Sequence, residues 1–332
     1  MRTLINKFVI GASIAAGVSA IATSPAFAGS LTNASIGGTA ANDYYVYGVK
    51  DGKTTQITSN LSNVKKVLDG DATSPTGNVE LRASSEKAGF DFTKNTELKG
   101  LIGGRDITLS SLTKADWESK DSQGITLAKR WFDGALGANG FGSLLNLSAP
   151  VAPTKPQNMT QAQFFNSPAY KAYAKALTAY TVSSTAYNGA WGMFNTDQGL
   201  ARFSDPNISY VNQDDTGLIK IGLAGHYDAT SLLFGSLDQT LINSLRDPNK
   251  VGKPIQASEI VKYTYDGKTD YLYSFSATDS KLISDDGTKS HNGNYEVSIQ
   301  GKPPVKTPEP SVMLGMLVVG GVFATQRKLK KA

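Results

Sequence analysis

The chain has 332 residues, of which 40% are hydrophobic, and it carries a formal net charge of +5 at pH 7. It contains no cysteine and only two histidines. These counts exclude a thiol nucleophile, a thiolate metal site, an iron–sulfur cluster and a multi-histidine metal site. The length suffices for one large domain or two smaller ones without disulfide bonds.

The N-terminus predicts a secretory signal peptide over residues 1–28. Arg2 and Lys7 form a short basic region, an apolar run follows, and Ala26-Phe27-Ala28 provides an A-x-A cleavage site. We expect signal peptidase to cut after Ala28, so that the exported chain begins at Gly29. An uncleaved N-terminal anchor is the alternative, but it would need a longer apolar run and no A-x-A site.

Alternating apolar residues predict strands in the first third of the exported chain. A hairpin is expected over residues 45–57, with Asp51-Gly52 as its turn, and short strands at 79–82 and 106–109. Tight hairpins join antiparallel neighbours, so antiparallel pairing is expected.

The spacing then changes to that of a helix over residues 125–136. Leu127, Trp131 and Leu136 fall on or near one face, and Gly137 is the expected stop. Residues 148–157 hold three prolines and form a connector. That connector is either a domain boundary or a crossover within one domain.

The clearest helix is predicted over residues 168–182. Ser167 is its expected N-cap, and Pro168 occupies the first helical position. Large side chains recur at intervals of three and four: Tyr170, Tyr173, Leu177 and Tyr180. We interpret this stripe as core-facing, with a ligand-stacking ladder of tyrosines as the alternative.

Strands return in the C-terminal half. They are expected at 208–211, 218–223 and 294–300, with a partly helical segment at 231–245 and a tyrosine-rich hairpin over 261–275 that turns at Asp266-Gly267. The sequence therefore predicts an α+β fold, with a β-rich antiparallel, sandwich-like body over residues 29–302 and a helical middle segment. Residues 303–307 read as a linker.

The last 25 residues have three parts in order. Pro308-Glu309-Pro310 is followed by an apolar run over 312–325 and then by the basic residues Arg327, Lys328, Lys330 and Lys331. A helix-breaking tripeptide, a transmembrane helix and a basic end that stays in the cytoplasm are typical of a membrane sorting signal. An ordinary C-terminal anchor after a proline-rich linker is the alternative.

This tail resembles the PEP-CTERM signal of two-membrane bacteria, with Ser311 and the glycines 315, 320 and 321 where such signals carry small residues. The resemblance covers residues 308–332 and not the body. It implies that an exosortase-type membrane protease cuts near Pro308-Glu309-Pro310. It also implies transit through the inner membrane to the cell surface or the extracellular space, in envelopes often associated with exopolysaccharide.

Without the two targeting ends the chain is electrically neutral. Residues 1–28 carry two basic residues and no acid, and residues 308–332 carry four basic residues and one acid, which leaves 27 of each sign. A neutral body argues against a nucleic-acid binder, which needs a sustained basic excess.

Motifs for catalysis are mostly missing. Asp-Gly-Lys-Thr occurs at 51–54 and 266–269, but a phosphate-binding loop also needs a glycine where the chain has Tyr47 and Lys262. Hairpin turns explain both sequences, and we expect no cofactor.

The two histidines have simple explanations. His226 has Asp228 two residues away, which suits base catalysis, but a histidine held by a backbone carbonyl at a glycine-rich turn is the favoured interpretation. His291 lies in the polar loop 285–294, whose oxygens would hold Ca²⁺ weakly, although a plain solvated loop is favoured.

Three classes of function remain. The leading hypothesis is a non-catalytic surface or matrix protein. The second is a carbohydrate-binding module in which the hairpin over 261–275 supplies a stacking platform. The third is a secreted hydrolase with a carboxylate pair, for which the sequence offers several aspartates without selecting two: Asp197, Asp205, Asp214 and Asp215.

Overall fold

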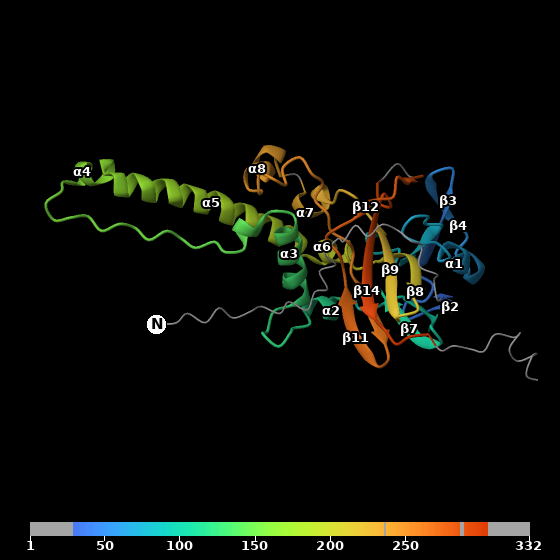
Figure 1. Cartoon of the computed structure of the whole chain (residues 1–332). Coiled ribbons are helices and arrows are strands. Elements are labelled where there is room, and N and C mark those ends of the chain that lie inside the picture. The colour runs from blue at the N-terminus through green and yellow to red at the C-terminus, as the bar shows by residue number, and fades with distance from the viewer. Residues whose placement is uncertain (1–28, 236, 286–288, 305–332) are drawn as a thin grey trace, which may run out of the picture.

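A computed structural model describes residues 29–235, 237–285 and 289–304 (Figure 1). The body is mixed α and β and rich in strands, as predicted. Within the described residues the strands form two sheets, and every pairing is antiparallel except the short parallel contact between β13 and β4.

The larger sheet has nine strands. Eight follow the order β12-β14-β9-β8-β5-β3-β4-β13, and β1 pairs with β8. Their bounds are Thr278–Asp279 (β12), Gly293–Gln300 (β14), Leu218–Gly225 (β9), Asn207–Gln213 (β8), Gly77–Leu81 (β5), Tyr44–Lys50 (β3), Lys53–Ile57 (β4), Ile283–Ser284 (β13) and Gly29–Ser30 (β1).

The smaller sheet has five strands in the order β11-β10-β7-β6-β2. Their bounds are Lys268–Leu272 (β11), Val261–Tyr265 (β10), Arg105–Ser110 (β7), Glu97–Ile102 (β6) and Thr32–Gly37 (β2). The two sheets share one hydrophobic core, to which the larger contributes Val79 and Ile221, for example, and the smaller Leu98 and Ile107. Helix α1 (Leu61–Val67) adds Val64 and Val67 to the same core.

The remaining helices gather on one side of the sheets (Figure 1). They are α2 (Lys114–Glu118), α3 (Leu127–Ala138), α4 (Gln161–Asn166), α5 (Pro168–Phe194), α6 (Asp197–Ala201), α7 (Thr230–Phe234) and α8 (Gln239–Ser244), with a 3₁₀ turn at Gly142–Leu144. Apart from α4, they enclose a second core centred on Trp131, which stacks on Phe194 at 5.0 Å between ring centroids and lies 4.4 Å from Phe203.

Most of the predicted elements are present. Both Asp-Gly hairpins are confirmed, with positive φ at Asp51, Gly52, Asp266 and Gly267, as two-residue turns of this kind require. Helix α3 buries the predicted face, but Gly137 does not stop it. The helix continues to Ala138, and Gly140, with φ +91°, follows the cap.

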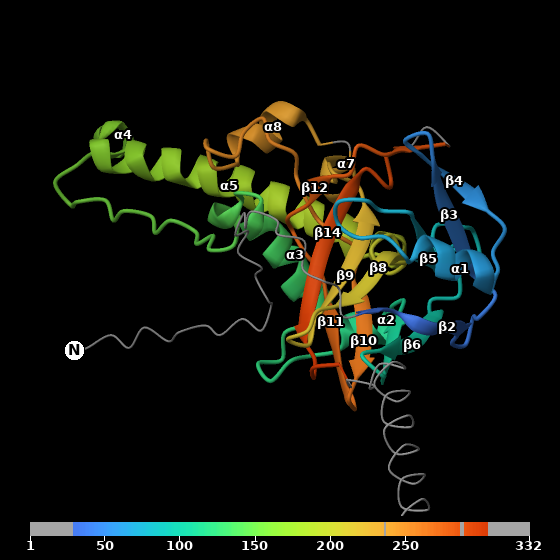
Figure 2. The same cartoon turned by 45° about the vertical axis from the view of Figure 1, so that its right-hand side comes forward.

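Helix α5 departs from the prediction. It begins at Pro168 with Ser167 as N-cap, as expected, but it runs on to Phe194, 27 residues in all. Only Ala186, Ala190 and Phe194, near its C-terminal end, are buried. The core-facing interpretation of the tyrosine stripe is therefore wrong, because the N-terminal half of the helix projects from the body, as two views agree (Figures 1 and 2).

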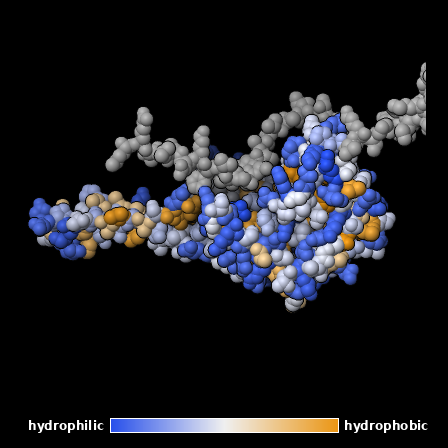
Figure 3. Space-filling view, turned by 90° about the horizontal axis from the view of Figure 1, so that it is seen from below, coloured by the Kyte–Doolittle hydropathy of each residue, from blue (hydrophilic) through white to orange (hydrophobic). Residues whose placement is uncertain are grey.

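We call residues 148–182 the arm. It contains the connector over 148–157, helix α4 and the projecting half of α5, and it forms a thin extension in the space-filling view (Figure 3). Helices from both sides of the connector, α3 and α5, pack into the core around Trp131. Among the described residues, no helix is both long enough and apolar enough to cross a membrane.

Candidate functional site

A groove runs between strands β11 and β14, which lie side by side in Figure 1. Its volume is about 290 Å³. β11 is the last strand of its sheet, and within the described residues β12 pairs with β14 only at Gly293 and Asn294. The groove therefore lies between two largely open sheet edges, and the start of α3 contributes to its wall.

Three tyrosines line the groove: Tyr263, Tyr271 and Tyr273. The pairing register places Tyr263 opposite Asp270 and Tyr271 opposite Lys262, so these two rings lie on opposite faces of the hairpin. Tyr263 packs against the sheet core and Tyr271 against the helical core. The hairpin thus presents rings to the groove from both of its faces and does not form one flat platform.

Tyr271 is fixed in position by a buried carboxylate. Its hydroxyl donates to Asp116 Oδ1 at 2.9 Å, and Lys262 Nζ lies 2.8 Å from the same oxygen. Burial acts to raise the pKa of Asp116, but hydrogen bonds from Lys262, Thr113 and Tyr271 lower it below its usual range. Burial raises the pKa of Tyr271 to about 12, and the neighbouring Asp116 adds to that shift, so its hydroxyl stays neutral.

Tyr273 is supported from behind by other aromatic rings. Its ring centroid lies 5.4 Å from that of Phe275, which in turn lies 5.8 Å from Trp131 in the helical core. Burial raises the pKa of the Tyr273 hydroxyl as well. This arrangement fixes the ring orientation before any ligand arrives, which reduces the entropy lost on binding.

Polar side chains of both charges complete the lining. They are Arg130, Lys268, Asp270, Ser274, Glu296, Ser298 and Gln300. Glu296 accepts from the Tyr210 hydroxyl at 3.0 Å and pairs with Lys220 at 3.0 Å, which orients it. Aromatic faces flanked by directional donors and acceptors suit a neutral, hydroxyl-rich ligand.

The aspartates singled out from sequence do not come together. Asp197 pairs with Lys114 at the start of α6, Asp214 accepts from Thr216 and Leu218 within a turn, and Asp215 is exposed. Only Asp205 is buried, at 7% exposure, and Ser85 donates to it.

The acidic neighbour of Asp205 is Glu259, which the sequence did not single out. Glu259 accepts from the Asn207 backbone N–H at 2.9 Å. Burial raises the pKa of both carboxyls well above their usual ranges; repulsion from Glu80 adds to the shift of Asp205, and repulsion from Asp205 adds to that of Glu259. Neither carboxyl lines the groove. Because Glu259, which is half-buried, lies in a segment without strand or helix periodicity, no sequence signal marks its position beside Asp205.

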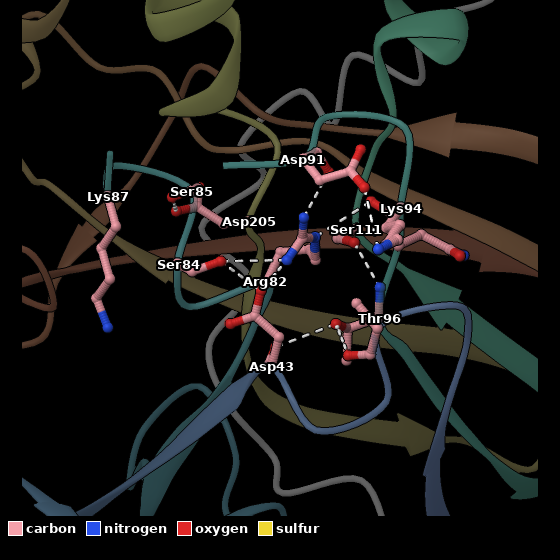
Figure 4. A network of polar contacts seen from close by, with 12 residues as sticks. Asp43, Arg82, Ser84, Ser85, Lys87, Asp91, Lys94, Thr96, Ser111 and Asp205 are labelled. Atoms are coloured by element: carbon pink, nitrogen blue, oxygen red, sulfur yellow. Dashed lines mark hydrogen bonds and ion pairs between the residues drawn. The ribbon is translucent and has the colours of Figure 1, made fainter. Parts of the chain in front are cut away.

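A network around Arg82 secures the loop that covers Asp205 (Figure 4). Arg82 is buried, pairs with Asp43, and donates to the Lys94 carbonyl at 3.2 Å, while its guanidinium stacks 4.4 Å from the Phe90 ring centroid. These contacts hold residues 82–94 together, so we assign the network to stability and not to ligand binding.

The two histidines lie in different surroundings. The His226 carbonyl accepts from the Tyr295 hydroxyl at 2.6 Å, and the Asp228 carboxylate accepts from the Thr230 backbone N–H at 3.0 Å. His291 is buried, with its Nδ1 3.0 Å from Thr54 Oγ1 and its ring 4.6 Å from that of Tyr47. The favoured interpretation of a fully solvated loop is therefore wrong at His291.

The weak Ca²⁺ loop falls partly outside the described residues, since 286–288 are not among them. In the part of the chain that the structure describes, no cluster of three or more histidine or acidic side chains is arranged to hold a metal ion. The processing residues Ala26, Ala28, Pro308, Glu309 and Pro310 also lie outside it, as do the basic residues Arg327, Lys328, Lys330 and Lys331.

Comparison with known proteins gives no match to this chain: no family model, curated protein or solved structure is similar to it.

Proposed function

We propose that this chain is an exported, non-catalytic protein of the cell envelope or extracellular matrix, and that its body binds saccharide in the groove between β11 and β14. The single observation that carries the binding proposal is the set of three tyrosines in the groove, of which Tyr271 is held by Asp116 and Tyr273 by Phe275, beside polar groups of both charges. We further infer that the two sheets sharing one core form a sandwich-like body between the signal peptide and the transmembrane sorting helix.

A saccharide fits this groove better than the other common ligand classes. Tyrosine rings stack on the apolar faces of sugar rings, while carboxylates, amides and a guanidinium hydrogen-bond the hydroxyls. A strand of another chain is disfavoured, because Lys268, Asp270 and Glu296 place charges along both open edges. The groove volume of about 290 Å³ suits a short stretch of a polysaccharide chain.

The binding proposal is tested with a glycan array and the exported protein. Tyr273→Ala removes one ring from the groove and should weaken binding of the selected glycan about tenfold or more. Tyr180→Ala in the arm is the matched control and should leave the affinity unchanged. If no glycan binds, or if both variants bind alike, the groove does not recognise saccharide.

The sorting proposal rests on the two targeting ends. Small side chains at Ala26 and Ala28 suit signal peptidase, so N-terminal sequencing should begin at Gly29. Mass spectrometry of the surface form should show that residues 312–332 are missing. Replacing Pro308-Glu309-Pro310 with alanines should keep the tail attached. An intact tail on wild type, with identical sorting of the variant, would identify a simple anchor.

A carboxylate-dependent hydrolase is the second candidate, because Asp205 and Glu259 are neighbouring carboxyls with raised pKa values. Activity toward polysaccharides or peptides that disappears in Asp205→Asn, with the fold intact, would support it. If wild type acts on none of these substrates, Asp205 and Glu259 have a structural role only.

A further inference from the structure

The arm is an extended element with little support from the body. Helix α4 packs on the start of α5 and buries its own Phe164 there. Residues 168–182 of α5 are exposed except for three half-buried tyrosines. At 1.5 Å per residue this part of the helix is about 22 Å long. An isolated helix of this length is marginal in water, so a surface that covers it would stabilise it.

The charge of the arm is entirely positive. No acidic residue occurs between Asp133 and Asp197, whereas Lys155, Lys171 and Lys175 all lie in the arm and are exposed. Lys171 and Lys175 are one helical turn apart, where like charges repel. None of the ion pairs among the described residues involves these three lysines. Their charge is therefore available to an anionic partner.

The arm also exposes apolar and aromatic side chains. At its tip four rings form a cluster, in which Phe165 lies 4.7 Å from Tyr170, and Tyr170 lies 5.9 Å from Tyr173. Phe165 is 45% exposed, Leu177 38% and Val182 42%. Hydrophobic residues are visible along the length of the arm in Figure 3. Tyr170, Tyr173, Leu177 and Tyr180 recur at helical spacing and so share one face.

We propose that the arm docks on the surface of an anionic lipid bilayer. The tyrosine and leucine stripe would lie at the boundary between headgroups and acyl chains, where aromatic side chains are favoured. Helical spacing puts Lys171 and Lys175 on the side of α5 away from the stripe, where their charges would attract the anionic headgroups over about one Debye length. The projection of the arm allows this contact without steric interference from the body (Figure 1).

Two other occupants suit the arm less well. A saccharide needs several directional polar groups beside the rings, but residues 168–182 offer only lysines, threonines and the tyrosine hydroxyls themselves. A second copy would bring lysines against lysines, with no acidic side chain in either arm to pair with them. The absence of acid and the exposed apolar face together favour lipid.

The chain has no cysteine, so a single introduced one can carry a fluorophore that reports its surroundings. In the full-length chain, Ala169→Cys places the probe on the exposed arm, and Gln56→Cys on β4 places it on the body as the matched control. Vesicles of phosphatidylcholine alone are compared with an equal mixture of phosphatidylcholine and phosphatidylglycerol. Because the basic tail also favours anionic vesicles, the body probe and the lysine variants are needed to isolate the contribution of the arm.

We expect the arm probe to shift its emission to the blue with the anionic vesicles only, and the body probe to remain unchanged. Replacing Lys171 or Lys175 with glutamine should weaken the response about fivefold each. Added salt should weaken it further.

Equal responses with both vesicle types, or full responses after both lysine substitutions, would overturn the proposal. Two further results would overturn it, each with an arm probe that does not respond to vesicles. In one, the chain binds an acidic polysaccharide such as alginate; in the other, it forms oligomers in sedimentation that depend on the arm. Circular dichroism of each variant verifies that the helix content is retained.

Discussion

The hairpin β10–β11 and the arm are both rich in tyrosine, yet they place their rings in opposite surroundings. In the hairpin and the residues after it, Tyr271 donates to Asp116 and Tyr273 packs on Phe275, so the rings are fixed from behind. In the arm, the Tyr170 ring lies against Phe164, Phe165 and Tyr173 on a helix that projects from the body.

This difference shows that tyrosine spacing reports the secondary structure but not the burial. A ring supported by a core is preorganised and suits a ligand with a defined shape. A ring on an unsupported helix suits a soft and adaptable surface such as a lipid headgroup layer. The predictions that follow test this contrast, from the largest expected effect to the smallest.

The largest effect is expected at the core behind the groove. Trp131 is fully buried and contacts Phe194, Phe203 and Phe275. Trp131→Ala should lower the free energy of unfolding by about 3–5 kcal/mol, because it removes these contacts and leaves a cavity. Urea unfolding measures the change. The same truncation in the arm, Tyr173→Ala, should cost much less, and equal losses would contradict the contrast.

The anchor of Tyr271 comes next. Asp116→Ala leaves the Tyr271 hydroxyl and the Lys262 ammonium without their shared acceptor, and it removes the Asp116 half of the capping box of α2, in which the carboxylate accepts from the Thr113 backbone N–H. We expect a loss of about 2 kcal/mol in stability and weaker saccharide binding. Tyr271→Phe separates the two effects, since it keeps the ring and should cost about 1 kcal/mol. An unchanged affinity in Asp116→Ala would show that the anchoring is irrelevant to the groove.

A pH effect is expected from the buried Asp205 and its half-buried neighbour Glu259. Both pKa values are higher in the folded chain than in the unfolded chain, so the folded state binds protons more tightly. The free energy of unfolding contributed by the pair therefore falls as pH rises above about 4, the unfolded pKa, and is lowest above the folded pKa values.

Asp205→Asn replaces one of the two carboxyls with an amide that does not bind a proton in this pH range. Between about pH 4 and pH 8, the urea concentration at the unfolding midpoint should fall less for the Asp205→Asn variant than for wild type. Asp197→Asn, at an exposed carboxylate, is the control and should retain the wild-type slope. If the urea midpoint changes with pH by the same amount in wild type and in Asp205→Asn, then Asp205 does not titrate in this range.

The smallest effect on global stability is expected in the arm. Ala174→Pro breaks the exposed part of α5, where proline costs about 3 kcal/mol in a helix interior. Because this segment opens independently of the core, the global unfolding midpoint should move by less than about 0.5 kcal/mol in free energy. Helix content by circular dichroism should fall, while saccharide binding stays unchanged. A large midpoint shift would show that the arm folds together with the body.

Local signals in the sequence predicted the elements whose structure is decided locally. Asp51-Gly52 and Asp266-Gly267 fixed both hairpins, since few other dipeptides tolerate two consecutive positive φ angles. Gly103-Gly104 carries the same signal between β6 and β7, but only the second of these strands was predicted.

Tertiary features were less accessible from the sequence. The stripe of Tyr170, Tyr173 and Leu177 has the period of a buried face, and nothing in that period shows that the body ends near residue 183. The groove draws its lining from α3, β11 and β14, which are far apart in the chain, so only the hairpin part was predicted. Export and sorting remain predictions from the two ends.

Titration of the exported protein with the glycan selected on an array tests the central claim most directly, with Tyr273→Ala and Tyr180→Ala measured in parallel by calorimetry. The account predicts that wild type and Tyr180→Ala bind with the same affinity and that Tyr273→Ala binds at least about tenfold more weakly. Equal affinity of all three proteins would place the binding site elsewhere and contradict the account.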